Sequence, residues 1–190
     1  FTDRRPASFP ELSHMSGSSY LLDGTTPLHR IGFGAMRLCD QPGNFGPYPA
    51  WDQGIELLRK AAALGAGLID TAHAYGPGWN ELLIGDAFAH SNERPLIATK
   101  GGVEKTAPDR ILPDGRPATL KRRCKESLRW LRLSCIDLYQ LHWPERNVPM
   151  FGQYWFDPAH EYESGVYQQG ERKEWVSIRN QLETLSELIK

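Results

Sequence analysis

The chain has 190 residues, of which 40% are hydrophobic and 11% aromatic, a composition typical of one globular domain with a sizeable core. No apolar run approaches the ~20 residues of a membrane helix, and 22 Lys and Arg against 23 Asp and Glu give a net charge of −1. We therefore expect neither a nucleic acid nor a membrane as partner. Cysteines are sparse and lack metal-ligand spacing, which favours a reducing, cytoplasmic location and no metal.

The first 18 residues differ from the rest in composition. They contain no apolar core, so they do not form a secretory signal. The Ser-His-Met-Ser run is typical of the extra amino acids that an expression vector adds. We expect 1–18 to be a disordered or cloning-derived arm and 19–190 to belong to a single domain. Just after the arm, Asp23-Gly24 between two short apolar pieces predicts a β-hairpin.

Strands and helices alternate after this hairpin. Short apolar runs predict four strands, at 30–36, 67–70, 95–100 and 135–142. Amphipathic spacing predicts four helices, at 51–66, 79–90, 118–133 and 173–190. This alternation indicates parallel strands with helical crossovers, in either a doubly wound sheet or a (β/α)8 barrel.

Three of the intervening features carry further expectations. The fourth helix is expected to bury an apolar stripe made of Trp175, Ile178, Leu182 and Leu185. The segment between the third strand and the third helix reads as a loop rich in Pro and Gly. The segment 143–172 is polar and aromatic and too long for an ordinary connection, so it is either a substrate lid or wall, or a partner surface.

The glycines after the first strand do not fit the dinucleotide-binding fingerprint of a doubly wound fold. Gly32 and Gly34 have the right spacing, but Arg37 stands where the third glycine belongs. The run FGAMRLCDQPG also does not open a helix, as that fingerprint requires. The barrel is therefore favoured over the doubly wound sheet.

Ionisable residues stand at the ends of three successive predicted strands. Asp70, Lys100 and His142 end the second, third and fourth strands, and Tyr75 follows on the loop after Asp70. Each has an ordinary explanation alone: a helix cap, a surface lysine, a core histidine. Together they are better explained by a barrel site, because catalytic groups of such barrels project from the carboxyl ends of several strands.

These residue types suit proton donation to a carbonyl oxygen. A phenol has a pKa of ~10. A nearby ammonium lowers this pKa and so makes the phenol a better acid. A carboxylate can hold that ammonium in place, and an imidazole can orient the carbonyl. Tyr75, Lys100, Asp70 and His142 therefore form a candidate cluster for carbonyl reduction.

The sequence resembles the aldo-keto reductases over about residues 19–190. The matching pieces are GFGAMRL, DTAHAYG followed by NELLIGDAF, ATKGG, and RRCKESLRWLRLSCIDLYQLHWP. The resemblance implies a (β/α)8 TIM barrel that binds NADPH across its mouth without a Rossmann fold. Only the first half of such a barrel is present in this sequence, so we expect the whole protein to be longer.

The same resemblance implies roles for single residues. Tyr75 would be the general acid, with Asp70 and Lys100 as its tuning pair and His142 orienting the carbonyl. Trp143 matches an aromatic residue that lines the substrate pocket, and Glu81 matches an acid that we expect to be structural. The cofactor-binding residues would be Gly34, Ala35, Met36 and Asp70.

The predicted function is an NADPH-dependent carbonyl reductase acting on a small aldehyde or ketone. One alternative is a regulatory subunit that binds the cofactor with little turnover, like the barrel-shaped β subunits of potassium channels. Another is an aldolase that forms a Schiff base on Lys100. The sequence leaves the substrate, the direction of the reaction in the cell and the oligomeric state open.

Overall fold

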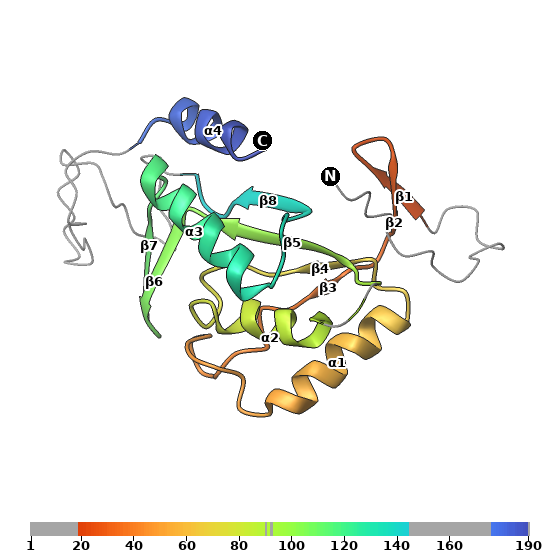
Figure 1. Ribbon diagram of the computed structural model, residues 1–190. Coiled ribbons are helices and arrows are strands. Elements are labelled where there is room, and N and C mark those ends of the chain that lie inside the picture. The colour runs from red at the N-terminus through yellow and green to blue at the C-terminus, as the bar shows by residue number, and fades with distance from the viewer. Residues whose placement is uncertain (1–18, 90, 92, 145–175, 190) are drawn as a thin grey trace.

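The structure is a computed structural model that describes residues 19–89, 91, 93–144 and 176–189. The strands are β1 Ser19–Leu22, β2 Thr26–His29, β3 Phe33–Gly34, β4 Leu68–Asp70, β5 Leu96–Gly101, β6 Val103–Ala107, β7 Arg110–Pro113 and β8 Leu138–Leu141. The helices are α1 Trp51–Ala63, α2 Trp79–Phe88, α3 Pro117–Trp130 and α4 Ile178–Glu187 (Figure 1). The expected arm, most of the aromatic loop and Trp175 lie outside the described residues. Within the described part, no helix is long and apolar enough to cross a membrane.

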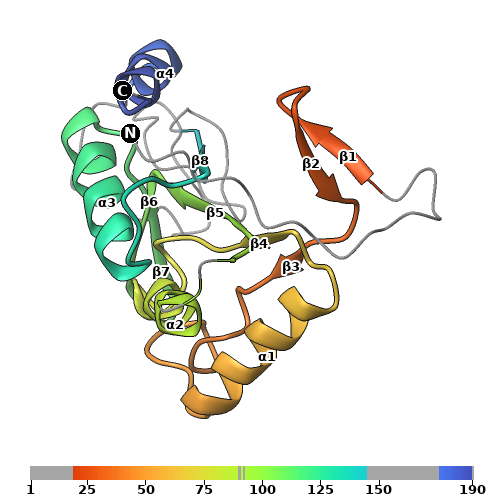
Figure 2. The ribbon, with the colours of Figure 1, turned by 45° about the vertical axis from the view of Figure 1, so that its right-hand side comes forward.

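A four-stranded parallel sheet forms the centre of the molecule. Its strand order is β3-β4-β5-β8, and every neighbouring pair is parallel. Helices α1, α2 and α3 cover one face of this sheet (Figure 2). The hairpin β1–β2 stands near the amino ends of the strands and the β6–β7 pair leaves their carboxyl ends (Figure 1). Parallel strands joined by helical crossovers are therefore confirmed.

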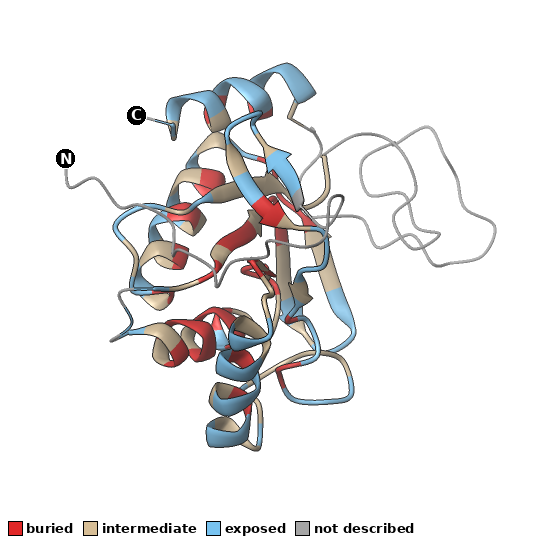
Figure 3. Cartoon of the chain, turned by 90° about the vertical axis from the view of Figure 1, so that its right-hand side faces the viewer, coloured by how far each residue is buried: buried red, intermediate tan, exposed pale blue. Residues whose placement is uncertain are grey.

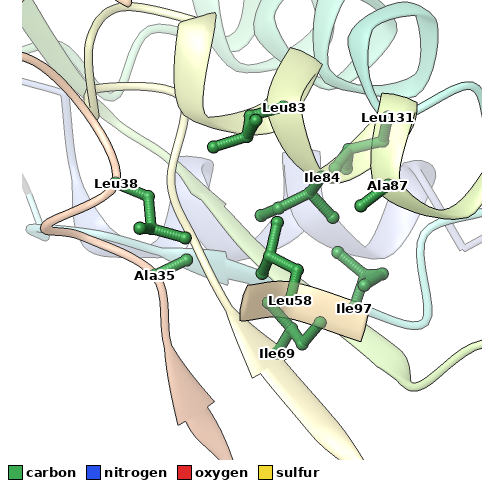
Figure 4. Close-up of a cluster of buried hydrophobic side chains, with 9 residues drawn as sticks. All are labelled: Ala35, Leu38, Leu58, Ile69, Leu83, Ile84, Ala87, Ile97 and Leu131. Atoms are coloured by element: carbon green, nitrogen blue, oxygen red, sulfur yellow. The ribbon is translucent and has the colours of Figure 1, made fainter. Parts of the chain in front are cut away.

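The hydrophobic core lies between the sheet and its covering helices. Ile69 and Ile97 point from β4 and β5 toward α2, where Leu83 and Ile84 meet them (Figure 4). The buried surface follows this interface, while the outer faces of α1 and α4 are largely exposed (Figure 3). Since successive strand residues face opposite sides, the neighbours of these isoleucines project from the other face of the sheet.

The first hairpin and the first helix end as their sequences predict. Asp23 and Gly24 have φ of 54° and 78°, the left-handed conformation that such turns need. Asp23 Oδ1 also accepts hydrogen bonds from the N–H groups of Thr25 and Thr26, both at 3.0 Å. Gly65, with φ of 96°, follows the end of α1 and closes it.

Two expectations about local structure are wrong. The segment expected as a loop after β5 contains an antiparallel hairpin, β6–β7, whose two-residue turn is Pro108-Asp109. The first strand is also much shorter than predicted, because only Phe33 and Gly34 pair with β4.

The buried face of α4 also differs from the prediction. Ile178 and Leu182 are 41% and 54% exposed, whereas Gln181 and Thr184 are buried. The Gln181 amide donates to Val176 O at 2.8 Å, so its polar group is satisfied inside the interface. A buried polar side chain with a partner costs little, so this polar side of α4 can face inward.

Candidate active site

The strand register brings the predicted strand-end residues to one face of the sheet. Asp70 pairs with Ala98, and Lys100 lies two residues farther along β5 on the same face. Lys100 pairs in turn with Gln140, and His142 lies two residues farther along the chain. The His142 N–H donates to Gly101 O at 2.7 Å and so continues the ladder past β8. The three side chains therefore follow a diagonal across the carboxyl ends of the strands.

Lys100 and Asp70 form an ion pair. Lys100 Nζ lies 2.6 Å from Asp70 Oδ1 and also donates to Thr71 O at 2.7 Å. The lysine side chain is 14% exposed, whereas the Asp70 side chain is 43% exposed. The ammonium is therefore held by two oxygens beneath a carboxylate that still reaches water.

Tyr75 lies over this pair and beside the histidine. Its ring centroid is 5.5 Å from Lys100 Nζ. The rings of Tyr75 and His142 are perpendicular, with their centroids 5.6 Å apart. The four residues of the predicted cluster are thus connected by contacts from Asp70 to Lys100, from Lys100 to Tyr75 and from Tyr75 to His142.

The pKa of Tyr75 is shifted in the direction opposite to the one expected. Burial raises the pKa of this phenol, and the charge of Asp70 raises it further. The lowering expected from Lys100 does not prevail, because Asp70 compensates the ammonium charge at 2.6 Å. Tyr75 consequently keeps its proton at neutral pH, which is the state that a proton donor needs.

His142 is neutral in this environment. Burial and, after it, the charge of Lys100 lower the pKa of its imidazole to about 4, and Asp70 opposes them only in part. Its Nδ1 is buried and has no hydrogen-bond partner in the part of the chain that the structure describes. A neutral ring at this place has one N–H to donate and brings no positive charge to the site.

The loop after β3 begins beside Asp70. Gly34 pairs with Asp70, and the Ala35 N–H donates to Asp70 O at 2.8 Å. A Cβ added to Gly34 would meet nothing within 4 Å, and Met36 is 41% exposed. Ala35 itself is fully buried, and its N–H and its carbonyl are both hydrogen-bonded inside the protein. Gly34 and Met36 thus form an open strip of surface beside the ion pair.

The sequence profile of the Aldo/keto reductase family matches residues 30–190. The chain belongs to this family. Its members are oxidoreductases that use NADP(H). Pyridoxine 4-dehydrogenase of Escherichia coli is 36% identical over 127 residues, which are 67% of this chain and 44% of that protein. An uncharacterized oxidoreductase of Schizosaccharomyces pombe is 34% identical over 137 residues, 69% of this chain and 42% of that protein. The chain thus spans less than half the length of these relatives.

Solved structures of the family share the fold. A glycerol dehydrogenase from Gluconobacter oxydans superposes with a TM-score of 0.62 at 32% identity, over 71% of this chain and 42% of that one. An aldo-keto reductase from Bacillus halodurans in its holo form gives 0.53 at 29% identity, over 62% and 37%. The expected aldo-keto reductase barrel is therefore confirmed, and the described residues form its first parallel strands.

Trp143 connects the aldo-keto reductase rim to the unexpected hairpin. Together with Ile111 and Leu112 of β7, it belongs to a small second apolar cluster. At the other end of the hairpin, Pro108 lies against Gly43, where an added Cβ would come within 2.9 Å of it. Sequence reasoning missed this hairpin, although Pro108-Asp109 between two short runs is a turn signal.

The first turn of α2 holds two buried polar residues beneath the site. Glu81 is fully buried and accepts a 2.5 Å hydrogen bond from Thr99 Oγ1. Burial raises the pKa of this carboxyl to about 7, which agrees with the structural role expected for it. Asn80, also fully buried, was not singled out from the sequence. The available signal was a poor helix former placed at the start of a helix.

Proposed function

We propose that this chain carries the catalytic residues of an NADPH-dependent carbonyl reductase that converts a small aldehyde or ketone to an alcohol. The observation behind the proposal is the convergence of Tyr75, His142 and the Lys100–Asp70 pair at one rim of the barrel. Membership of the aldo/keto reductase family supports it.

Tyr75 would act as the general acid and His142 as the orienting group. The raised pKa of Tyr75 keeps the hydroxyl protonated, and the lowered pKa of His142 keeps its ring neutral. A carbonyl oxygen placed between the two rings would accept hydrogen bonds from both. NADPH, when bound, supplies the hydride that the carbonyl carbon receives. The Tyr75 proton then completes the alcohol, and the phenolate that remains takes a proton from water.

Lys100 would stabilise the charge that this transfer leaves on Tyr75. Its ammonium lies 5.5 Å from the ring centroid, near enough to favour the phenolate over the neutral ring as the proton departs. Asp70 would hold the ammonium in this position. The pair thus acts on the transition state, where negative charge develops, more than on the resting acid.

The cofactor and the substrate would occupy the two sides of this cluster. The open strip along Gly34 and Met36, next to Asp70, would receive the nicotinamide, and the buried Ala35 between them would hold the strip in place. Trp143, which follows His142 directly, would contact the substrate from the hairpin side.

Replacing Tyr75 by Phe tests the proposal in the intact protein. The variant lacks only the hydroxyl, so turnover of an aldehyde should fall by about 10³-fold, within the range typical of a lost general acid. The NADPH dissociation constant, measured by fluorescence titration, should change by less than about twofold, since no cofactor contact is removed. Tyr48→Phe, which alters a ring packed on the core, is the matched control and should keep full turnover.

Normal turnover in Tyr75→Phe would overturn the assignment of the acid. A wild-type protein that binds NADPH yet reduces no aldehyde or ketone would favour the regulatory subunit. Trapping of a substrate on Lys100 by borohydride, without any need for NADPH, would favour the aldolase.

A further inference from the structure

The Asn80 side chain joins three separate segments of the chain. Its Nδ2 donates to Ala35 O and to Leu38 O, each at 2.8 Å. Its Oδ1 accepts a 2.6 Å hydrogen bond from Thr71 Oγ1. Asn80 is fully buried, so both of its donors and its acceptor are used inside the protein.

These bonds are not those of an ordinary residue at a helix start. An Asn in that region commonly accepts from an N–H of its own helix. Here the cap position is taken by Gly78 in the left-handed conformation, and the Asn80 amide reaches partners 42 and 45 residues away in the sequence. Asn also favours a helix less than Ala does. Formation of α2 therefore does not explain this side chain.

The bonds fix the shape of the loop at 35–38. Both carbonyls that Asn80 binds are turned into the protein, toward α2. Because a trans peptide directs its C=O and its N–H to opposite sides, the Met36 N–H is turned away from Asn80. The Asn80 backbone N–H meanwhile donates to Tyr75 O at 3.3 Å. One residue thus ties the open strip to the loop that carries the phenol.

We propose that Asn80 is a positioning residue that holds the loop at 35–38 in the shape required for cofactor binding, in fixed relation to Tyr75. The inference rests on the proposed function, since it assumes that this loop receives the nicotinamide. Without the amide, the Leu38 carbonyl would lose this donor and the Ala35 carbonyl would keep only the Leu38 N–H, so the loop would shift to find other donors. The Lys100–Asp70 pair has its own contacts and would remain.

NADPH titration of the intact protein, followed by fluorescence, tests the inference. Asn80→Ala is expected to raise the NADPH dissociation constant at least about tenfold and to reduce kcat at saturating NADPH by a smaller factor. Thr71→Val, which leaves both carbonyl bonds in place, is expected to raise the constant less. Leu131→Ala is the control, because Leu131 lies on the far side of the same core from Ala35 and Leu38 (Figure 4). It should lower the melting temperature and leave the constant unchanged.

Hydrogen exchange of the protein without cofactor gives a second readout. Amides 35–40 should exchange faster in Asn80→Ala and at the wild-type rate in Leu131→Ala. If Asn80→Ala does not fold, Asn80→Ser, which keeps one donor, takes its place with a smaller expected effect.

Two results would overturn the inference in different ways. A wild-type protein that binds no NADPH overturns the proposed function, and the inference with it. A wild-type protein that binds NADPH, beside a folded Asn80→Ala variant with the same dissociation constant and the same exchange rates, overturns the inference alone.

Discussion

Thr99 and Lys100 are neighbours in β5, yet they serve opposite faces of the sheet. Thr99 points toward the helices and binds Glu81, whereas Lys100 points to the other face and binds Asp70. Glu81 is fully buried and meets only a hydroxyl at this bond, so its pKa rises to about 7. Asp70 is partly exposed and meets an ammonium. The two faces of one strand thus offer a carboxyl group different surroundings, and burial beneath α2 drives the Glu81 carboxyl toward its neutral form.

Two histidines with similar pKa shifts show that such a shift alone does not mark a catalytic residue. The pKa of His73 and that of His142 are both lowered to about 4, mainly by burial. His73, however, lies under α3, where its ring packs against Trp130 with 5.2 Å between the centroids. His142 faces Tyr75 at the carboxyl ends of the strands. Both residues lie just past a strand end, so the neighbours of each ring, α3 for His73 and Tyr75 for His142, separate the two, and pKa does not.

Removal of Lys100, on the face of β5 that carries the ion pair, is expected to have the largest effect. Lys100→Met leaves Asp70 without its cation next to Tyr75, so the phenolate loses its nearest positive charge. Aldehyde reduction at neutral pH should fall by about 10³-fold. The pKa that limits the remaining rate should move upward, because a nearby cation favours the phenolate and its loss does the reverse. Steady-state rates across neutral and alkaline pH, at saturating NADPH, measure both effects.

The matched control for this prediction is Lys105→Met. Lys105 lies on β6 and donates to Pro108 O at 3.0 Å, away from the ion pair. It should keep nearly all activity with an unchanged pH profile. Full activity and an unshifted pH profile in Lys100→Met itself would show that Lys100 takes no part in the reaction.

On the face of β5 that α2 covers, replacing the Glu81 carboxyl by an amide that cannot ionise should stabilise the protein. The pKa of Glu81 is about 7 in the native state against 4.5 as the ordinary value. Between these values the native state keeps a proton that the unfolded state has lost, so stability falls as pH rises through this window. Gln in place of Glu81 cannot titrate. The unfolding free energy of Glu81→Gln should therefore exceed that of the wild type increasingly from pH 4.5 to 7, by up to about 3 kcal/mol.

Denaturant unfolding of both proteins over this pH range checks the sign. The lowered pKa of His73 acts the other way, because its contribution to stability is lost as pH falls from 6.5 through about 4. Since His73 is present in both proteins, the difference between them isolates Glu81. A difference that does not vary with pH would show that Glu81 is ionised in the native state throughout. Reduction of an aldehyde by Glu81→Gln should stay close to wild type, in contrast to Lys100→Met.

The smallest of these effects is expected from Asp70→Asn. The amide keeps one oxygen that can accept from Lys100, but it removes the charge that holds the ammonium. Activity should fall by about tenfold, with a smaller shift of the same pH profile than in Lys100→Met. A loss larger than that of Lys100→Met would mean that Asp70 acts directly on the cofactor or the substrate.

The parallel sheet and the four rim residues were predictable because they depend on local patterns. Short apolar strands end in Asp70, Lys100 and His142, and an alternation of period two fixes the face to which each points. Family resemblance supplied the role of Tyr75, which spacing alone does not. These roles remain proposals, while the proximity of the side chains is seen in the structure.

Other features depend on contacts that no local pattern records. The inward face of α4 contains a hydrogen-bonded amide, that of Gln181, which the periodicity of the sequence would place toward solvent. The pKa of Tyr75 depends on the balance between burial and a compensated cation, and the sequence gives neither quantity. The bonds of Asn80 join residues more than 40 positions apart. Such features emerge only when the chain is folded.

The two-residue step from Asp70 to Lys100 to His142 has a consequence for how this site tolerates insertions and deletions. A change in the length of the hairpin turn at Pro108-Asp109 leaves the strand ends where they are. One residue added or removed within β5 would instead exchange the two faces of the strand beyond that point. An added residue would put Thr99 in the place of Lys100 above Asp70, whereas a removed residue would put Lys100 in the place of Thr99, with its ammonium against Glu81 under α2. The site therefore tolerates a change of length in the β6–β7 turn but not within β5.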